Sequence, residues 1–463
     1  MKKTTRVFAL LLSALMLFSM LAGCKAPAAT TSESVGSASE SAASGSGESK
    51  YAGRTLKILL SVGGAGNYYE PVAERMMETY PGLTVEIDYN SAAADVLRTE
   101  ILSGDAPDIW NINSVQLPPY DAIDQGIAMP VDEIFEEKTM DGSATLADIT
   151  DPSLFTLGEV DGKHYLMFDM MYLNGLWYDA NFFETNHLTV PTNWDELMQL
   201  GEQCKALGMD LFGYSGLLAS EYAANYWFWP MVATTDYNTY VDIQNLDETA
   251  FKSAGMQKIV EKMVAIRDQG YYDKNTMGLG NSETQMAFIN HDFALLPCGS
   301  WLEAEMADAW TDEWKLAYLP YSFGTNAGDT QYMFTECLFS MVSATTKNLD
   351  LVKEFYRFLF SDHDSIYNSV SIHQNPVDIN GFSDNYGELL LPSVNDASQA
   401  LNKMTTINTP VYWWYSAFNT EIGNMINALM SGDIDGDAFM QRGCDLITGI
   451  KNDNTIVKHE FNG

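Results

Sequence analysis

Residues 55–112 alternate between strand-like and helix-like patterns, and this alternation constrains the fold more than any other feature of the chain. Residues 56–60 are an apolar run typical of a buried strand, and residues 83–89 alternate apolar with polar side chains. Residues 108–112 form a third strand pattern, and amphipathic helical patterns fill both intervals. Strands that alternate with helices need right-handed crossovers, so the chain is predicted to be α/β with a parallel sheet.

The same two patterns recur further along the chain. Asn193 is placed to cap a helix, with Glu196 reaching back as in a capping box, and Gly208 is suited to its C-terminal end. Short apolar strands are expected at 294–296 and 316–319, with helices dominating from about residue 347. The C-terminal part is therefore predicted to be mainly helical.

The N-terminal segments follow one another in the order that is typical of a lipoprotein signal peptide. Three basic residues precede an apolar run over 7–20 that is too short to cross a bilayer comfortably. The run ends in Leu-Ala-Gly-Cys, which resembles the lipobox of bacterial lipoproteins and makes Cys24 the lipidation site; the alternative is an ordinary buried cysteine. We predict a signal peptide over 1–23, a flexible lipidated tether over 24–52, and a place on the extracellular face of the cytoplasmic membrane.

Charge and cysteine content exclude several classes of protein. The 463 residues carry a formal charge of −37, which repels nucleic acid and anionic lipid, so neither is an expected partner and the membrane is reached through the anchor only. The 411 residues after the tether suffice for two or three domain-sized units. Four widely spaced cysteines favour buried free thiols, with one disulfide left open: Cys204, Cys298, Cys337 and Cys444.

Motifs for catalysis or metal binding are poor. The glycines at 63, 64 and 66 match neither a dinucleotide loop nor a P-loop, and Gly213–Gly216 is one residue short of a nucleophile elbow. The six histidines are scattered, and the aspartates at 433, 435 and 437 lack the glycine of a calcium loop and indicate a solvated turn. We expect no enzyme, metal or cofactor. A cell-surface glycosidase is the alternative, although nothing singles out a carboxylate pair.

Several short segments, taken in order, resemble family 1 extracellular solute-binding proteins, which include the maltodextrin-binding proteins. Residues 296–303 also resemble the branch that binds N-acetylglucosamine and diacetylchitobiose. The first loop differs from the maltodextrin pattern, because glycine and alanine replace a charged pair; this favours a ligand contacted by backbone and neutral amides. The matching segments are 80–85, 102–109, 178–183, 190–197 and 299–301.

The resemblance implies two α/β lobes that cross near Phe168, Tyr318 and Ser361. Lobe I would comprise 53–167 plus 318–361, and lobe II would comprise 168–317 plus 362–463. It also implies a monomer that captures a carbohydrate between the lobes and delivers it to the permease subunits of an ABC importer. A ligand sensor that docks on a receptor shares every one of these features.

Sugar recognition needs flat aromatic platforms and fixed polar groups. The resemblance places Trp301, Tyr226 and Tyr172 at the ligand, with Trp229 beside them in a Trp-Pro match and Trp413 and Trp414 near a third platform. The alternative is that each aromatic packs in a core. Loops at the carboxyl ends of strands add four polar candidates, Ser61, Asn67, Asn111 and Asn113. For the asparagines, the alternative is that they only form turns.

Overall fold

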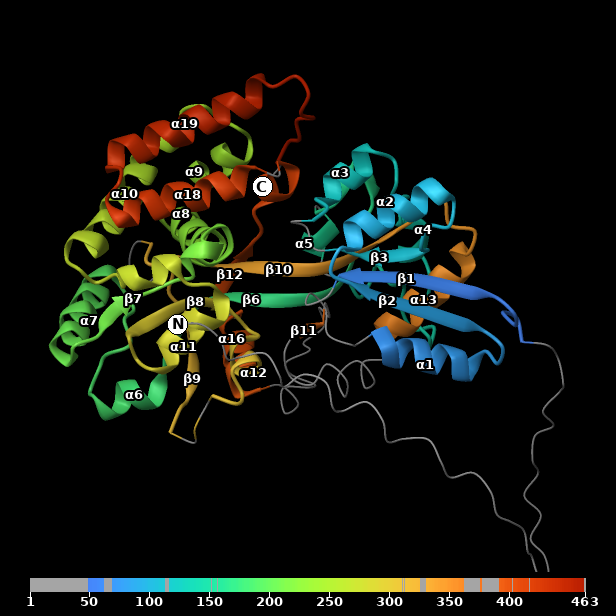
Figure 1. The fold of residues 1–463 in the computed structure, drawn as a ribbon, viewed down its shortest axis with the longest axis horizontal. Coiled ribbons are helices and arrows are strands. Elements are labelled where there is room, and N and C mark those ends of the chain that lie inside the picture. The colour runs from blue at the N-terminus through green and yellow to red at the C-terminus, as the bar shows by residue number, and fades with distance from the viewer. Residues whose placement is uncertain are drawn as a thin grey trace, which may run out of the picture. The chain divides into compact units, whose positions relative to one another are not determined.

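The structure is a computed structural model that describes residues 49–61, 69–112, 116–150, 152–155, 157–309, 311, 313–324, 330–361, 375–376, 391–401, 403–415 and 417–461. Three predicted functional residues, Cys24, Asn67 and Asn113, lie outside these ranges. Figure 1 shows the arrangement of the helices and strands.

The predicted alternation of strands and helices is confirmed. Strands β1 (Thr55–Ser61), β2 (Thr84–Asn90) and β3 (Ile109–Asn111) are parallel, and helices α1 (Tyr69–Thr79) and α2 (Ala93–Ser103) connect them. Strand β1 lies between the other two, with Leu60 opposite both Tyr89 and Asn111. The carboxyl ends of β1 and β3 therefore lie side by side, which brings Ser61 close to Asn111.

Both faces of this parallel sheet are covered, as a near-continuous apolar strand requires. Leu56, Ile58 and Leu60 of β1 pack with α1 and α13 (Leu349–Ser361) in one hydrophobic cluster. Leu59 points to the opposite face, where it packs with α2 and α3 (Pro119–Asp124) in a second cluster. Figure 1 shows these two helical layers on either side of the blue strands.

Two long antiparallel strands, β6 (Met167–Asp179) and β10 (Gln331–Val342), extend the sheet. β10 pairs with β3 at one end, and β6 continues to β8 (Phe293–Gly299), which pairs with the short β7 (Asp210–Phe212). The described strands run in the order β2-β1-β3-β10-β6-β8-β7. β9 (Leu316–Leu319) and β11 (Asn375–Pro376) pair with β6, and β12 (Met404–Ile407) pairs with β10. The residues at which two lobes divide stay a prediction.

The remaining elements are mostly helices. The first group comprises α4 (Asp132–Phe135), α5 (Pro152–Phe155), the strands β4 (Glu159–Val160) and β5 (Lys163–His164), α6 (Ala180–Thr185), α7 (Trp194–Leu207), η1 (Gly216–Leu218), the π-helix η2 (Ser220–Phe228), α8 (Trp229–Thr235) and α9 (Tyr237–Gln244). The second comprises η3 (Ala250–Lys252), α10 (Ala254–Asp268), η4 (Lys274–Gly278), α11 (Asn281–Ile289), α12 (Leu302–Glu305), α16 (Pro392–Ala400), α17 (Pro410–Trp414), α18 (Phe418–Ser431) and α19 (Gly436–Asn452).

Local sequence predictions are confirmed with one correction. The Asn193 side chain caps α7 by accepting from the Glu196 amide, and Gly208 ends the helix at a φ of 81°. Glu196, however, accepts from the amide and hydroxyl of Thr192 instead of the Asn193 amide, so the reciprocal bond reaches one residue further back. The four cysteines are all buried as thiols, and no disulfide joins any two of them.

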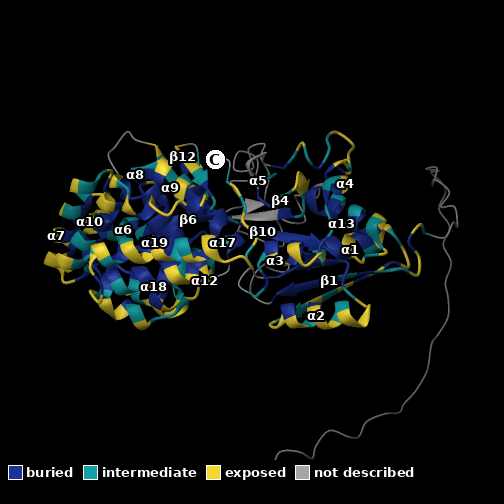
Figure 2. Cartoon of the chain, turned by 90° about the horizontal axis from the view of Figure 1, so that it is seen from above, coloured by how far each residue is buried: buried dark blue, intermediate teal, exposed yellow. Residues whose placement is uncertain are grey.

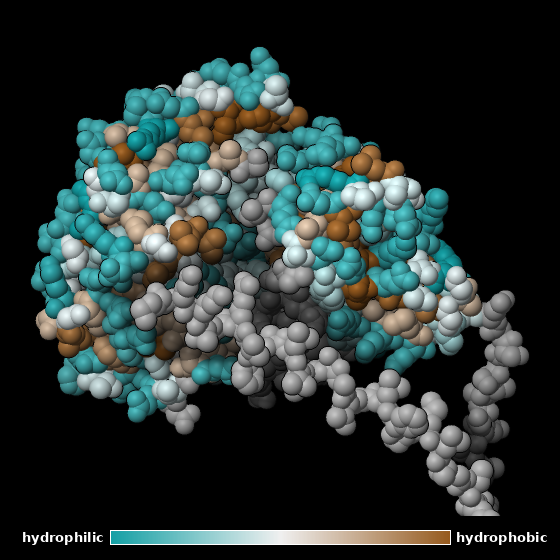
Figure 3. Space-filling view, in the orientation of Figure 1, coloured by the Kyte–Doolittle hydropathy of each residue, from teal (hydrophilic) through white to brown (hydrophobic). Residues whose placement is uncertain are grey.

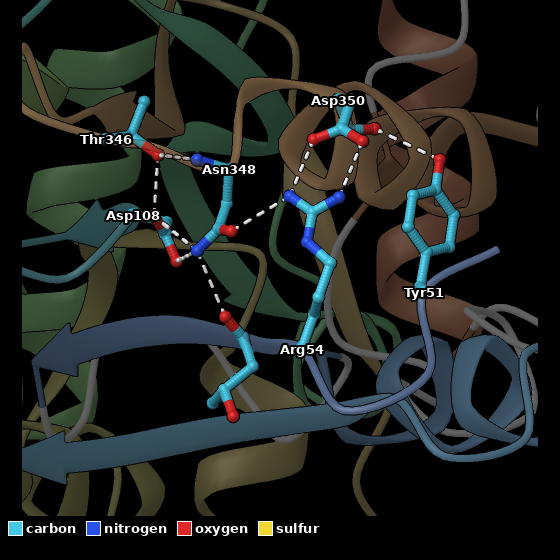
Figure 4. A network of polar contacts seen from close by, with 7 residues as sticks. Tyr51, Arg54, Asp108, Thr346, Asn348 and Asp350 are labelled. Carbon is cyan, nitrogen blue, oxygen red and sulfur yellow. Dashed lines mark hydrogen bonds and ion pairs between the residues drawn. The ribbon is translucent and has the colours of Figure 1, made fainter.

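A polar network, buried at Asp108 and exposed at Asp350, joins the start of β1 to the loop before α13 and its first turn (Figure 4). Asp108 accepts hydrogen bonds from the Lys57 amide, the Thr346 hydroxyl and the Asn348 side chain. Arg54 forms a bidentate ion pair with Asp350, at 2.7 and 2.8 Å. These contacts fix the return of the chain to the first strand after nearly 300 residues.

Burial follows the layers. Buried residues lie along the strands, and exposed residues lie on the outer faces of the helices (Figure 2). The described surface in the view of Figure 3 is mainly hydrophilic, with small separate apolar patches, as the acidic composition predicts. Within the described ranges, no helix has the length and apolar character needed to cross a membrane.

Candidate functional site

Trp301 lies at the turn that follows strand β8, as predicted. Ser300 anchors this turn, because its hydroxyl accepts from the Leu173 amide of β6 at 3.3 Å. The indole lies over Gly299, where an added Cβ would come within 2.0 Å of the ring. Trp301 is half-buried, so part of its ring remains accessible to solvent. The structure thus positions a partly open aromatic platform at the end of a buried strand.

Two tyrosines contact this indole, and a third tyrosine contacts one of them. Tyr172 of β6 meets Trp301 edge-on at a ring-centroid distance of 5.0 Å, and Tyr226 of η2 lies 6.0 Å from it. Tyr222 lies one π-helical step before Tyr226, with the two rings 5.3 Å apart. We refer to Tyr172, Tyr222, Tyr226 and Trp301 as the ring cluster. Its three predicted members, Tyr172, Tyr226 and Trp301, come from segments far apart in the sequence, and the fold brings them together.

Two acidic residues that the sequence analysis did not identify lie beside the ring cluster. Glu336 of β10 lies directly opposite Tyr172 of β6, and its Oε2 accepts from the Tyr226 hydroxyl at 3.1 Å. Glu221 lies on η2, next to Tyr222. We refer to these two as the Glu221–Glu336 pair. Both keep some solvent exposure, although protein atoms surround them densely.

The pair has unusual protonation behaviour. Burial, followed by the negative charge of Glu221, raises the pKa of Glu336 to about 7, against the opposing effect of the Tyr226 hydrogen bond. Burial also raises the pKa of Glu221. No described Lys, Arg or His counters either shift. Two carboxyl groups that share a site in this way hold a proton near neutral pH.

A π-helix beside this cluster is itself informative. π-helical turns are rare, and they are frequently found at functional sites. Here η2 supplies Glu221, Tyr222 and Tyr226, and its last turn carries the fully buried Trp227. The irregular helix therefore holds two rings and a carboxylate against the face formed by β6 and β10.

The other predicted aromatics lie elsewhere. Trp229 is fully buried and stacks on Phe418 at 6.2 Å, within the helical core. Trp413 packs 5.3 Å from Phe339, and Trp414 lies near Tyr120 and His459. Trp414 also lines a separate cavity of about 410 Å³ together with His459 and Phe461. None of the three makes a ring contact with the ring cluster among the described residues.

The polar candidates at the strand ends are placed as the parallel sheet requires. Ser61 and Asn111 are both buried, at 5% and 6% exposure, on neighbouring strands. The Asn111 side-chain nitrogen has no hydrogen-bond partner among the described residues. Asn67 and Asn113 follow the same two strands and lie outside the described residues. An unpaired buried donor at a sheet edge is available to a ligand or a water molecule.

The sequence contains one feature that could have identified Glu336 as a candidate site residue. It is a charged residue inside an otherwise largely apolar strand of 12 residues. A single acidic residue in such a strand is expected to contact either a hydrogen-bonding partner or a ligand-binding site, because burying an unpaired charge is costly. Glu221 had a weaker signal, its position at the start of the aromatic run that ends at Trp229. No group of three or more metal-ligating side chains is found in the described part of the chain.

These features define a class of protein. Mixed α/β layers on one sheet, joined by the long strands β6 and β10 that carry Tyr172 and Glu336, form the two-lobed fold of solute-binding proteins. The model of the bacterial extracellular solute-binding protein family matches residues 62–364, and the chain belongs to that family.

Relatives and solved structures agree with this assignment. The chain is 24% identical to the diacetylchitobiose-binding protein NgcE of Streptomyces coelicolor, over 88% of this chain and 87% of that protein. It is 22% identical to a multiple sugar-binding protein of Streptococcus mutans, over 74% and 77%. A chitin oligosaccharide binding protein shares the fold with a TM-score of 0.66 at 17% identity, covering 85% of this chain and 98% of that structure.

Proposed function

We propose that this protein is the substrate-binding component of an ABC importer that captures a sugar or oligosaccharide between its two lobes and delivers it to permease subunits. The ring cluster carries the proposal, because a partly open indole flanked by tyrosines matches the apolar face of a sugar ring. Glu336 and the neighbouring hydroxyls supply acceptors and donors for the hydroxyl rim. The similar proteins named for sugars support the same class of ligand.

The proposed ligand contacts are Trp301, Tyr172 and Tyr226, with Ser61 and Asn111 from the strand ends of the other half of the sheet. The roles of Asn67 and Asn113 remain predictions. Trp229 is fully enclosed, so a ligand contact there would require the helical core to open. Sugars of the N-acetylglucosamine and chitobiose type are the first to test, given the resemblance of residues 296–303 and the named ligand of the Streptomyces relative.

A thermal-shift screen against a sugar library tests the proposal. A ligand that binds only the folded state raises the melting temperature by mass action. At least one sugar should raise it for the wild type, and the shift should shrink in Trp301→Ala. Absence of any shift across amino sugars, glucans and xylans would contradict a carbohydrate ligand. Small-angle scattering with the hit should show a smaller radius of gyration if the two lobes close on it.

A glycosidase is the second candidate, and the Glu221–Glu336 pair is the observation that favours it. Glycoside hydrolysis uses two carboxyl groups, one of them with a raised pKa as the acid. Incubation with a labelled oligosaccharide separates the two functions, because a binding protein returns the sugar intact and a glycosidase cleaves it. A sensor without transport would be distinguished by the absence of neighbouring permease genes.

We further propose that the mature protein is a monomer, held by a diacylglycerol-modified Cys24 on the extracellular face of the membrane. The proposal rests on the order of basic residues, apolar run and lipobox, and on the polar segment that follows. A diacylglycerol anchor contributes two acyl chains, enough for stable attachment, and a tether of this length leaves the folded part free to meet its ligand and then the permease.

A further inference from the structure

The Glu221–Glu336 pair lies against the ring cluster, and no positive charge in the described part of the chain balances it. The only hydrogen bond to Glu336 among the described residues comes from Tyr226, and none of those residues donates to Glu221. Glu221 is the only described charge that acts on Glu336. A site that serves only neutral hydroxyl groups does not need two carboxylates, because amides and hydroxyls accept from them at a lower desolvation cost.

The surrounding elements add acidity and no basic residue. Tyr222 and Tyr226 face the pair from η2, Tyr172 from β6 and Cys298 from β8, and Glu305 acts on Tyr222 from α12. All of these groups are neutral or negative at neutral pH. The local field therefore disfavours anionic ligands such as sugar phosphates or uronic acids, and it favours a cation.

Geometry points the same way. Cross-strand partners share a face, so Tyr172 and Glu336 lie on one side of β6 and β10, and Asn174 lies two residues further along that side. The Asn174 side chain is fully buried, and neither its oxygen nor its nitrogen has a hydrogen-bond partner among the described residues. Asn174 and Tyr226 also line a common small cavity. The face of β6 and β10 thus carries a tyrosine ring, a carboxylate and an unused amide, and Tyr226 of η2 lies against it.

We propose that this site selects a 2-amino sugar with a free, protonated amine in preference to its N-acetylated form. An ammonium group is attracted to the faces of Trp and Tyr rings, and a nearby carboxylate strengthens the attraction when water is partly excluded. The inference rests on the proposed carbohydrate function and narrows it to one class of amino sugar.

The proton held by the pair sets the charge of the site. Near neutral pH Glu336 is partly protonated, because its pKa is about 7, and burial also raises the pKa of Glu221, so the two carboxyl groups together carry less than two negative charges. One ammonium group on the ligand compensates the remaining charge. An N-acetyl group removes the positive charge and leaves the carboxylate to be desolvated without compensation.

Calorimetric titration of the purified full chain near pH 7 tests the inference with two probes. They are the β-1,4-linked glucosamine disaccharide and its N,N′-diacetyl form. The free amine should bind about tenfold tighter or more, as expected for one partly desolvated charge pair. Glu336→Gln should remove this preference, and Glu221→Gln should reduce it. Glu74→Gln, which removes an exposed carboxylate on α1, should change neither affinity.

Each other outcome is decisive. Equal affinity for the two disaccharides, or tighter binding of the acetylated form, overturns the inference and leaves the carbohydrate function standing. A preference for the amine that survives in both Gln variants also overturns it. If no sugar binds but tetramethylammonium raises the melting temperature in wild type and not in Glu336→Gln, the carbohydrate function fails and the cation preference stands. If neither binds, both fail.

Discussion

The Tyr226 hydroxyl donates a hydrogen bond to Oε2 of Glu336 over 3.1 Å, joining the π-helix η2 to strand β10. The two residues are 110 positions apart in the sequence. The bond stabilises the charged form of Glu336, but burial and Glu221 oppose it more strongly. The carboxyl group is thus held in a state whose charge changes near neutral pH.

Glu336 makes stability depend on pH. Its pKa is about 7 in the folded protein and close to the ordinary value of 4.5 when unfolded, so the folded state binds a proton more tightly. The resulting stabilisation is present below the unfolded pKa and is lost as pH rises from about 4.5 to about 7. Urea unfolding near pH 5 and pH 8 should show a loss of about 1–3 kcal/mol from this group.

The control for that prediction is the uncharged variant. Glu336→Gln should lose less stability than the wild type between the two pH values, because its amide does not titrate. Glu74→Gln should keep the wild-type difference, since that side chain is exposed. Identical pH dependence in the wild type and Glu336→Gln would show that the carboxyl group titrates normally.

Trp301 and Trp229 should respond differently to truncation. Trp301 is half-buried at the ring cluster, so Trp301→Ala should weaken sugar binding by about 1–3 kcal/mol with a small change in melting temperature. Trp229 is fully buried, so Trp229→Ala should destabilise the fold by about 3–5 kcal/mol. Calorimetry and thermal melting of both variants check this. A large fall in melting temperature with intact affinity would assign Trp301 to the core.

Periodicity predicted the first half of the sheet well because strand and helix patterns there are local. The strands and helices between 55 and 112 appear where the apolar positions indicated them, and the Asn193 cap is confirmed. Ser61 and Asn111 become neighbours as a direct consequence of parallel pairing. Local pattern was sufficient for these elements.

Long-range pairing could not be predicted in the same way. Nothing local indicates that Tyr172 lies opposite Glu336, since the pairing joins strands more than 150 residues apart. The π-helix also escaped prediction, because its aromatic run fits a buried α-helix equally well. Glu221 and Glu336 were not predicted, because the role of a charged residue in an apolar segment depends on neighbours that are distant in the sequence.

Asp108 should be more important for stability than the ion pair beside it. It is 5% exposed and accepts from the Lys57 amide and from two side chains of the segment before α13. Asp108→Ala leaves those donors unpaired and should cost about 2–3 kcal/mol. Asp350→Ala breaks the Arg54 pair, whose side chains are 32% and 50% exposed, and should cost less than about 1 kcal/mol. Denaturant unfolding ranks the two; equal costs would contradict the burial argument.

The proposed anchor predicts a simple fractionation result. Cys24→Ala removes the thiol that would carry the lipid, so the protein should appear as a released or uncleaved form. Metabolic labelling with a fatty acid should mark the wild type and not the variant. A properly cleaved Cys24→Ala protein that stays tightly bound to membranes would contradict a lipid anchor at this residue.

Gly299 is predicted to set the position of the Trp301 ring. A Cβ at Gly299 would lie 2.0 Å from the indole, so Gly299→Ala must displace the ring and should weaken sugar binding about tenfold, with an overpacking cost of about 1–3 kcal/mol. Gly278→Ala is the matched control, because a Cβ there meets no atom within 4 Å. In a Trp301→Ala background the clash partner is gone, so Gly299→Ala should then cost little stability. A double-mutant cycle measures this coupling between the two substitutions, and it separates a steric effect on the ring from a general effect of alanine at the strand end. Additive losses of stability would show that Gly299 acts independently of Trp301.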